Sequence, residues 1–458
     1  MAGQFPGLSS VSLLVDNVMT REASLTSIES ILASAKQQWS GWRNLTFIER
    51  AQRLVPLSAL FDERAEELAQ QITRDMGKPI RQARFEVQRC RDAVPFYCEN
   101  CPEWFAPEDA YGGKIYHDSL GVVALIAPWN FPLTIPFLVA LPALIAGNTI
   151  VFKPSEYSPG SGAMLHALFE KVVPGVVQLV QGGKEHGAAL VSHPDVAMVA
   201  LTGSTAAGKQ VMRSAADRLC RVSLELGGID AAIVLPDMDP EIAAASIVAK
   251  NCSNAGQICC AAKWAYVPEE GLQAFLTAAV ECATALQVGD PFDEATEVGP
   301  LVNETQQQRV AALVGDARAR GATVHCGGTA NGNFYSPTIL SGITDDMRIV
   351  REECFGPVLP VMAYQSVEEV LERVNAQPYG LTASIWTKDL PRGEAIARAL
   401  RVGVAQVNNH GTPPIGAPWG GARESGIGRT RSREGAREFT NTKYVRIAVA
   451  PTERGCHL

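Results

Sequence analysis

The chain has 458 residues, of which 47% are hydrophobic and 19% are charged. This composition is ordinary for a globular protein, allows two or three domains, and gives no sign of disorder. The net charge is −8 with lysine and arginine scattered along the chain, which argues against nucleic acid and anionic membrane as partners and favours a small-molecule ligand.

Neither an export signal nor a membrane span is predicted. Residues Met1 to Gly7 lack the basic start and the continuous apolar core of a signal peptide. The most apolar run, Leu133 to Ile145, contains two prolines and is better explained as a buried helix. Eleven cysteines at irregular spacing indicate reduced thiols in a cytoplasm, and the pair Cys98 and Cys101 is interpreted as accidental and not as a redox or zinc element.

Helical patterns dominate the first hundred residues. Apolar residues at helical spacing predict helices over 24–42, 46–76 and 82–97. Ser24 and Thr46 are candidate N-caps, and Pro56 predicts a kink. The looser alternation from Tyr111 to His117 fits a strand that leaves the compact body and pairs with another element or another subunit.

From Gly121 onward, short apolar strands alternate with helices. Strands are predicted at 121–127, 149–152, 176–179 and 196–201, and helices at 133–146 and 160–172. This alternation indicates right-handed crossovers and a parallel, doubly wound sheet, which binds ligands at the carboxyl ends of its strands. Functional residues are therefore expected directly after each strand.

Three segments follow these strands with suitable chemistry. Asn130 is held between Pro128 and Pro132, so its amide can donate to a developing oxyanion. Lys153 and Glu156 can hold ribose hydroxyls, and the turn at 202–209 opens a helix whose free N–H groups suit a pyrophosphate. Each of the first two segments alone also fits an ordinary capped strand end, and the turn is not the common G-x-G-x-x-G.

Two further residues are candidates for the chemistry itself. Glu225 ends an apolar strand before two glycines, where burial would raise its pKa and suit a general base; a surface glutamate at a turn is the alternative. Cys259 follows a glycine-containing turn in the run Cys252 to Ala262, where N–H groups can stabilise a thiolate. The alternative for Cys259 is a small buried hydrophobic residue.

The second half continues the alternation and adds two loops. Helices are predicted over 241–251, 271–286 and 304–321, and strands over 262–267 and 404–409. A hairpin-like section is predicted at 331–340, and a chain reversal at 352–358. The Pro- and Gly-rich loop 410–416 is of the kind that shapes a pocket mouth.

Seven motifs in this order resemble the NAD(P)-dependent aldehyde dehydrogenase superfamily, from about Ser24 to the C-terminus. They are 128–133, 153–156, 203–208, 225–228, 256–259, 353–358 and 426–428. The resemblance implies an α/β protein with a doubly wound parallel-sheet cofactor domain, an α/β catalytic domain and a small β bridging arm for oligomerisation. It predicts the cofactor domain at 1–100 and 120–227, the catalytic domain at 228–429, and the arm at 101–119 and 436–458, in a homodimer or homotetramer.

The resemblance also implies roles by position. Cys259 matches the nucleophile, Glu225 the general base and Asn130 the oxyanion donor. The cofactor-binding positions are Ile126, Trp129, Lys153, Glu156, Gly203, Ser204, Gly208, Leu226, Glu353 and Phe355. The implied reaction oxidises an aldehyde to the acid through a cysteine thiohemiacetal and thioester, with hydride transfer to NAD(P) and no metal.

NAD is the expected cofactor, with NADP possible. The Glu156 carboxylate repels a 2′-phosphate, and Lys153 offsets part of that repulsion.

Several positions depart from the family pattern. Thr430 stands where several relatives carry a glutamate and Val139 where some carry a lysine, so the route by which Glu225 loses its proton stays open. Trp264 stands where semialdehyde-specific relatives tend to place an arginine, and Lys263 or Arg423 are possible substitutes. The stretch Met76 to Pro79 and the general length nevertheless resemble succinate-semialdehyde-type enzymes. Two alternatives remain open, an enzyme of that type and a catalytically retired structural protein of this fold.

Overall fold

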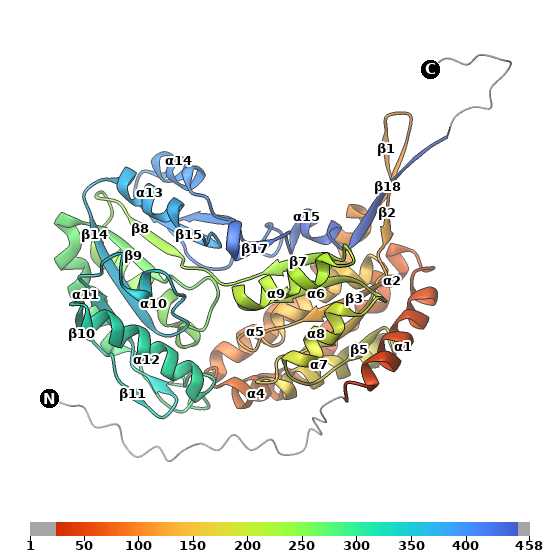
Figure 1. Cartoon of the computed structure of the whole chain (residues 1–458), viewed down its shortest axis with the longest axis horizontal. Coiled ribbons are helices and arrows are strands. Elements are labelled where there is room, and N and C mark those ends of the chain that lie inside the picture. The colour runs from red at the N-terminus through yellow and green to blue at the C-terminus, as the bar shows by residue number, and fades with distance from the viewer. Residues whose placement is uncertain (1–23, 448–458) are drawn as a thin grey trace.

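The computed structural model describes residues 24–447, in two lobes joined along one side and a projecting arm (Figure 1). Residues 1–23 and 448–458, which include Met1 to Gly7 and the outer ends of the predicted cofactor domain and arm, lie outside the described residues. Each lobe is built on a mostly parallel sheet covered by helices, so the predicted α/β class is confirmed. The domain boundaries stay predictions.

The first sheet has the strand order β17-β7-β6-β3-β4-β5. Its parallel strands are β3 (Val122–Ile126), β4 (Thr149–Lys153), β5 (Val177–Leu179), β6 (Val196–Thr202) and β7 (Arg221–Glu225), and β17 (Gly426–Ile427) is antiparallel at one edge. The chain proceeds outward from β3 to β5 and then returns to β6 on the other side of β3. The strand order therefore reverses between β3 and β6, where open α/β sheets bind ligands.

Helices cover this sheet on both faces. The crossovers carry α6 (Thr134–Ile145), α7 (Pro159–Val172), α8 (Lys184–Ser192) and α9 (Thr205–Ala216). The sequence pattern did not predict α8. Residues 133–146 form the buried helix α6, as expected from their apolar composition.

The N-terminal helices confirm most of the expected pattern. They are α1 (Ser27–Trp42), α2 (Phe47–Leu54), α3 (Leu57–Glu63), α4 (Ala65–Met76) and α5 (Ile80–Trp104). Thr46 caps α2 with a reciprocal capping box to Glu49, whereas Ser24 is not the N-cap of α1, because that helix begins after Thr26. Pro56 separates α2 from α3, as predicted.

Helix α5 extends beyond the predicted range and reaches Trp104 despite Pro95 and Pro102. Residues 101–104, which were assigned to the arm, therefore belong to this helix.

The second sheet has seven strands in the order β10-β13-β14-β9-β8-β15-β16. They are β10 (Thr323–Cys326), β13 (Thr338–Ser341), β14 (Val358–Tyr364), β9 (Trp264–Pro268), β8 (Ala231–Val234), β15 (Thr382–Trp386) and β16 (Val404–Val407), and only β10 is antiparallel. The helices of this lobe are α10 (Pro240–Cys252), α11 (Leu272–Ala285), α12 (Glu304–Ala319), α13 (Val367–Ala376) and α14 (Leu390–Ala399). A short hairpin, β11 (Ala330–Asn331) and β12 (Phe334–Tyr335), forms the first half of the section expected at 331–340. The second half of that section, which the sequence pattern predicted to be exposed, instead enters the buried strand β13.

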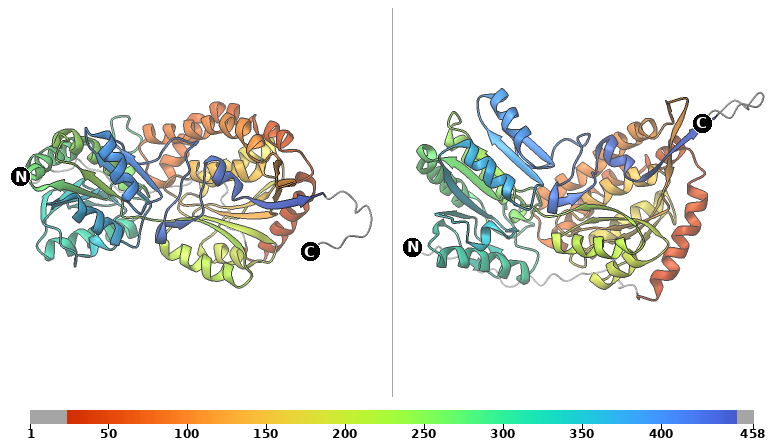
Figure 2. Two further views of the ribbon diagram at one scale, coloured as in Figure 1. Left: turned by 90° about the horizontal axis from the view of Figure 1, so that it is seen from above. Right: turned by 45° about the horizontal axis from the view of Figure 1, so that its top comes forward.

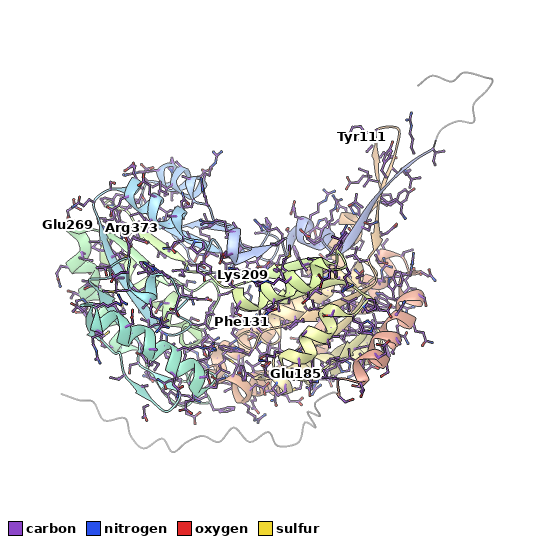
Figure 3. The ribbon with its side chains drawn as sticks, viewed as in Figure 1. Tyr111, Phe131, Glu185, Lys209, Glu269 and Arg373 are labelled. Atoms are coloured by element: carbon purple, nitrogen blue, oxygen red, sulfur yellow. The ribbon has the colours of Figure 1, made fainter. Side chains whose placement is uncertain are left out.

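The arm is a three-stranded antiparallel sheet of β1 (Glu108–Ala110), β2 (Gly113–Ser119) and β18 (Thr440–Arg446). It extends away from both lobes in the right-hand view of Figure 2, and Tyr111 lies at its tip (Figure 3). Strand β18 returns from the C-terminal end to pair with β2, from Thr440 opposite Ser119 to Arg446 opposite Gly113. Across residues 24–447, no helix has the length and apolar character required to cross a bilayer.

Candidate active site

The loop that carries Cys259 is shaped by three successive residues in the left-handed region. After α10, Asn254, Ala255 and Gly256 have φ values of 50°, 53° and 73°. A side chain at Gly256 is excluded, because a Cβ atom there would lie 2.1 Å from the carbonyl oxygen of Gly356. The buried Lys263 Nζ donates hydrogen bonds to the carbonyl oxygens of Gly256 and Ile258 at 3.3 and 2.9 Å. These bonds hold the backbone that precedes Cys259 in place.

Asn130 is tied directly to this loop. Its Nδ2 donates to the carbonyl oxygen of Gln257 at 2.9 Å. The Asn130 carbonyl in turn accepts from Lys78 Nζ at 2.8 Å and from Asn254 Nδ2 at 3.2 Å. These bonds hold the amide close to Cys259 and leave its second N–H for another acceptor.

Two cavities meet at Cys259. One has a volume of about 280 Å³ and is lined by Asn130 together with the segments that follow β3 and β6. The other, of about 60 Å³, is lined by Glu225. Cys259 lines both cavities, and it shares one with Asn130 and the other with Glu225.

Glu225 lies at the end of β7 and is buried. Thr430 Oγ1 donates to its Oε1 at 3.3 Å, and Oε2 has no hydrogen-bond partner among the described residues. Burial raises the pKa of Glu225 to about 8, although Arg431 and the Thr430 hydroxyl partly oppose the shift. The carboxyl group is therefore largely protonated near neutral pH. Thr430 and Val139 line the same cavity.

Cys259 and Cys260 have different surroundings. The Cys260 thiol and burial together raise the pKa of the Cys259 thiol well above its ordinary value. The two neighbouring thiols interact, and the same contact lowers the pKa of Cys260. Cys260 is more deeply buried, and its Sγ lies 3.6 Å from Thr412 Oγ1, on the side away from the larger cavity.

Six of the ten predicted cofactor residues line the 280 Å³ cavity. They are Trp129, Gly203, Ser204, Leu226, Glu353 and Phe355. Ser204 Oγ caps α9 by accepting a hydrogen bond from Ala207 N at 3.2 Å. The other N–H groups of the first turn have no partner within the helix and can bind an anion. The rings of Trp129 and Phe355 meet edge to face at 5.6 Å. An apolar cleft that ends at a free helix N-terminus fits a dinucleotide.

The other four predicted cofactor residues, Ile126, Lys153, Glu156 and Gly208, do not line this cavity. Ile126 and Lys153 are neighbours at the ends of β3 and β4, and Lys153 Nζ lies 3.8 Å from Glu156 Oε2. Gly208 faces Leu226, because a Cβ atom there would lie 2.6 Å from the leucine side chain. These residues adjoin the cavity along the same edge of the sheet, and their contact with a cofactor stays a prediction.

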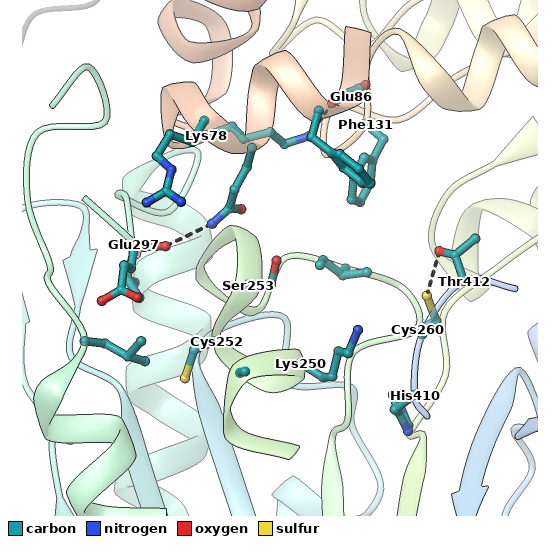
Figure 4. A pocket seen from close by; sticks show the side chains of 18 of the residues that line it. Lys78, Glu86, Phe131, Lys250, Cys252, Ser253, Cys260, Glu297, His410 and Thr412 are labelled. Atoms are coloured by element: carbon teal, nitrogen blue, oxygen red, sulfur yellow. Dashed lines mark hydrogen bonds and ion pairs between the residues drawn. The ribbon is translucent and has the colours of Figure 1, made fainter. Parts of the chain in front are cut away.

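A third space, of about 620 Å³, opens on the other side of the loop (Figure 4). It shares five lining residues with the small cavity, namely Arg89, Phe131, Ile258, Cys260 and Thr412. The predicted pocket-mouth loop contributes His410, Gly411 and Thr412 to its wall. This outer chamber therefore leads toward Cys259 from the side opposite the proposed cofactor cleft.

The three positions considered for a substrate-binding cation do not line any of these spaces. Trp264 belongs to the core of the second lobe, where it stacks on Tyr266 at 5.9 Å. Lys263 lies beneath the Cys259 loop, and Arg423 donates to backbone carbonyls such as that of Asn375. The sequence analysis missed Arg89 and Arg431, which do line the small cavity. Only the position of Arg431 after the Gly-x-Gly-Arg-Thr segment gave a local signal.

Metal and disulfide chemistry find no support within residues 24–447. No group of three or more His, Cys, Asp or Glu side chains is arranged there to hold a metal ion. All cysteines in that range are free, including Cys98 and Cys101 on α5.

The chain is similar to known proteins along most of its length. Residues 17–445 match the model of the "Aldehyde dehydrogenase family". Betaine aldehyde dehydrogenase of Cereibacter sphaeroides is 36% identical over 441 residues, covering 94% of this chain and 91% of that protein. Retinaldehyde dehydrogenase 3 of Rattus norvegicus is 38% identical over 428 residues, covering 91% and 84%. The crystal structure of an NAD-dependent aldehyde dehydrogenase from Sinorhizobium meliloti superposes with a TM-score of 0.92 at 31% identity, covering 95% and 89%.

Proposed function

The chain belongs to the aldehyde dehydrogenase family and oxidises an aldehyde to the carboxylic acid with NAD(P), and we propose that Cys259, Glu225 and Asn130 carry out this reaction. The observation that carries the proposal is the position of Cys259 between two cavities. One cavity suits the cofactor and holds Asn130, and the other holds Glu225. An aldehyde bound at the sulfur can therefore meet a hydride acceptor on one side and a base on the other.

The reaction begins with attack of the Cys259 sulfur on the aldehyde carbon. The attacking species is the thiolate, and the proton of the Cys259 thiol is lost to solvent water before or during formation of the C–S bond. The developing oxyanion is held by the free N–H of Asn130 and the backbone N–H of Cys259. NAD(P), held by the residues of the 280 Å³ cavity, supplies the hydride acceptor.

The second half of the reaction depends on Glu225. As a carboxylate it removes a proton from water, which attacks the thioester on Cys259 and releases the acid. Water attack breaks the C–S bond, and the sulfur regains a proton to restore the thiol. Thr430 Oγ1 is the hydroxyl that contacts Glu225, and it stands where several relatives carry a glutamate.

A binding assay and an activity assay together test this function. NAD should raise the melting temperature of the protein, and aldehydes should then yield NADH and an equal amount of acid. A thiol hydrolase that does not use the nucleotide would show no shift with NAD. The relatives found favour neither of the two alternatives left open by the sequence, the succinate-semialdehyde-type enzyme and the retired structural protein.

We also propose that NAD is preferred over NADP. The exposed Glu156 carboxylate lies at the edge of the sheet where the family binds the adenosine ribose, and Lys153 Nζ, 3.8 Å from it, offsets only part of its charge. We expect kcat/KM to be higher with NAD than with NADP. Glu156→Gln should reduce the ratio of kcat/KM with NAD to kcat/KM with NADP. A clear NADP preference in the unmodified protein would refute this assignment.

We propose that the protein forms a homodimer or homotetramer and is located in the cytoplasm. The arm exposes β18 at a sheet edge, which favours pairing with a second copy in a homodimer or homotetramer. The free cysteines of residues 24–447 are consistent with a reducing cytoplasm. Light scattering and cell fractionation test these two proposals.

A further inference from the structure

Two arginines line the small cavity beside Cys259. Arg89 comes from α5, and Arg431 immediately precedes the short helix α15 (Ser432–Arg437). Much of the rest of the lining is apolar, with Phe131, Leu138, Val139, Leu381 and Trp419 among its members. The mechanism described above uses neither arginine.

Both arginines lack an acidic partner. Within residues 24–447, no carboxylate lies within ion-pairing distance of either guanidinium. Arg431 is only 8% exposed, and its contacts are one 3.3 Å hydrogen bond from Nη1 to the Pro413 carbonyl and stacking on Trp419 at 5.1 Å. Lys78 shows the usual arrangement for a buried cation, because it forms an ion pair with the equally buried Glu86. Arg431 thus keeps most of its five N–H donors available.

The electrostatics of the cavity favour an anion. Burial and the neighbouring charge of Arg89 lower the pKa of Arg431, which means that two like charges oppose each other across a space of low polarity. Glu225 does not neutralise them while it is protonated. When Glu225 acts as a base, two cations and one carboxylate leave a single positive charge, which a monoanion matches.

The backbone at Arg431 is also unusual. Its φ of 58° and ψ of −173° belong to a region occupied almost only by glycine. A large side chain at such a position costs free energy, which is typical of residues whose side chain has a functional role.

We propose that Arg431 and Arg89 bind a carboxylate on the substrate, so that this enzyme acts on small aldehydes that also carry a carboxylate group. The inference rests on the proposed function, because the aldehyde end must lie at Cys259. Arginine forks match the two oxygens of a carboxylate in a bidentate geometry. A cationic substrate such as betaine aldehyde would meet two like charges and is excluded from the preferred class.

The outer chamber supports the same substrate class. Arg81 and Lys250 line it in addition to Arg89, whereas its acidic members are Glu297 and Glu86, the latter already paired with Lys78. Figure 4 shows Lys250 and Phe131 on opposite sides of the chamber that leads to Cys260 and Thr412. An excess of positive charge along this route raises the local concentration of an anionic aldehyde.

The first experiment compares three sets of aldehydes with the full-length protein. They are ω-oxo acids of four, five and six carbons, the unsubstituted aldehydes of equal length, and betaine aldehyde. We expect kcat/KM for the best ω-oxo acid to exceed that of its neutral counterpart by roughly tenfold to a hundredfold, as for a charged hydrogen bond. Equal values, or a preference for betaine aldehyde or for a phosphorylated aldehyde of similar length, would overturn the proposal.

The second experiment assigns the preference to the two arginines. Arg431→Met and Arg89→Gln should each reduce the ratio of kcat/KM for the ω-oxo acid to kcat/KM for the neutral aldehyde by roughly tenfold or more. Arg91→Gln is the matched control, because Arg91 lies on the same helix but pairs with Asp62 and Asp92 at the surface. If Arg431→Met does not fold, Arg89→Gln decides the question alone. An equal loss for all aldehydes with a shifted pH profile would mean that Arg431 only tunes Glu225, and would also overturn the proposal.

A binding measurement separates this proposal from the proposed function. Glutarate should raise the melting temperature of the unmodified protein more than the neutral glutaramide does, and the two arginine variants should lose this difference. Loss of all NAD(P)-dependent turnover together with retained glutarate binding would refute the proposed function and keep the carboxylate site. Turnover without selective glutarate binding would refute the carboxylate site alone.

Discussion

Glu225 shows how a single buried carboxyl can determine the pH dependence of an enzyme. Its position at the end of β7 was predicted from the sequence, but its environment depends on residues far along the chain. Thr430 supplies its one hydrogen bond, and Arg431 supplies a nearby positive charge. Burial has a larger effect on the pKa of Glu225 than both together. The free energy of hydration that a buried carboxylate loses exceeds the free energy that one hydrogen bond provides.

The first prediction at the residue scale concerns pH. A base must be deprotonated to act, and the pKa of Glu225 is raised to about 8. Steady-state turnover limited by thioester hydrolysis should therefore rise about tenfold per pH unit below that value and level off above it. Stopped-flow and steady-state assays across this range check the slope. A turnover rate independent of pH below neutrality would contradict the assignment.

Glu225→Gln gives a second, independent test. The variant should retain the initial burst of NADH, since Cys259 and the cofactor cavity are intact, while steady turnover falls by roughly 10² to 10⁴. Rapid-mixing absorbance resolves the two phases. A steady rate equal to that of the unmodified protein would remove Glu225 from the mechanism.

The two adjacent cysteines allow a matched comparison. Cys259→Ala should abolish both aldehyde oxidation and ester hydrolysis, because only Cys259 lines the cofactor and substrate cavities together. Cys260→Ala should keep substantial activity in both assays, because its sulfur lies outside the cofactor cavity. Equal losses in the two variants would show that the nucleophile has been assigned wrongly.

At the scale of elements, the start of α6 is fixed by a buried ion pair. Glu86 on α5 accepts hydrogen bonds from the Leu133 and Thr134 N–H groups at 3.0 Å, and so satisfies the N-terminus of α6. Its other oxygen contacts Lys78 Nζ, which also donates to the Asn130 carbonyl. The pair therefore links α5, α6 and the oxyanion-binding segment in one buried network.

Lys78→Met tests the importance of this network. Removing one partner leaves Glu86 buried and unpaired, so the free energy of unfolding should fall by about 3 to 5 kcal/mol. Arg84→Gln is the control, since its ion pairs with Glu66 and Glu294 are exposed and should contribute about 1 kcal/mol or less. Urea denaturation measures both. Similar losses in the two variants would mean that the buried pair has no special role.

At the scale of the whole molecule, the arm projects into solvent and does not pack against either lobe along its outer half (Figure 1). Strand β18 exposes Tyr444 and Val445, and Ile447 beyond it is 81% exposed. The apolar side chains lie at the outer end of an otherwise polar edge strand, whose unpaired backbone groups can pair with another chain. The arm is therefore the surface on which the proposed assembly rests.

Charges on the arm should disrupt the assembly. Val445→Lys combined with Ile447→Lys should shift the mass measured by light scattering to a smaller species, because lysines at a strand edge oppose pairing. Leu219→Lys serves as the control, since Leu219 is 91% exposed but lies outside the arm. If both variants keep the mass of the unmodified protein, the arm does not hold the subunits together.

The sequence by itself determined the α/β fold, the family and the positions of Cys259, Glu225 and Asn130. These features depend on short segments, in which strand alternation, prolines and glycines act locally and in chain order. Even so, α8, α13 and α14 were not predicted. For α8 the reason is that its nine residues include Gly187 and carry a weak helical signal.

Only the tertiary structure decided which charged side chains line the cavity beside Cys259. Lys263 and Arg423, chosen from their positions near motifs, turned out to hold backbone carbonyls, whereas Arg89 and Arg431 come from distant parts of the chain to one cavity. Burial and pairing of a charge depend on every element packed around it, and local sequence patterns do not contain that information.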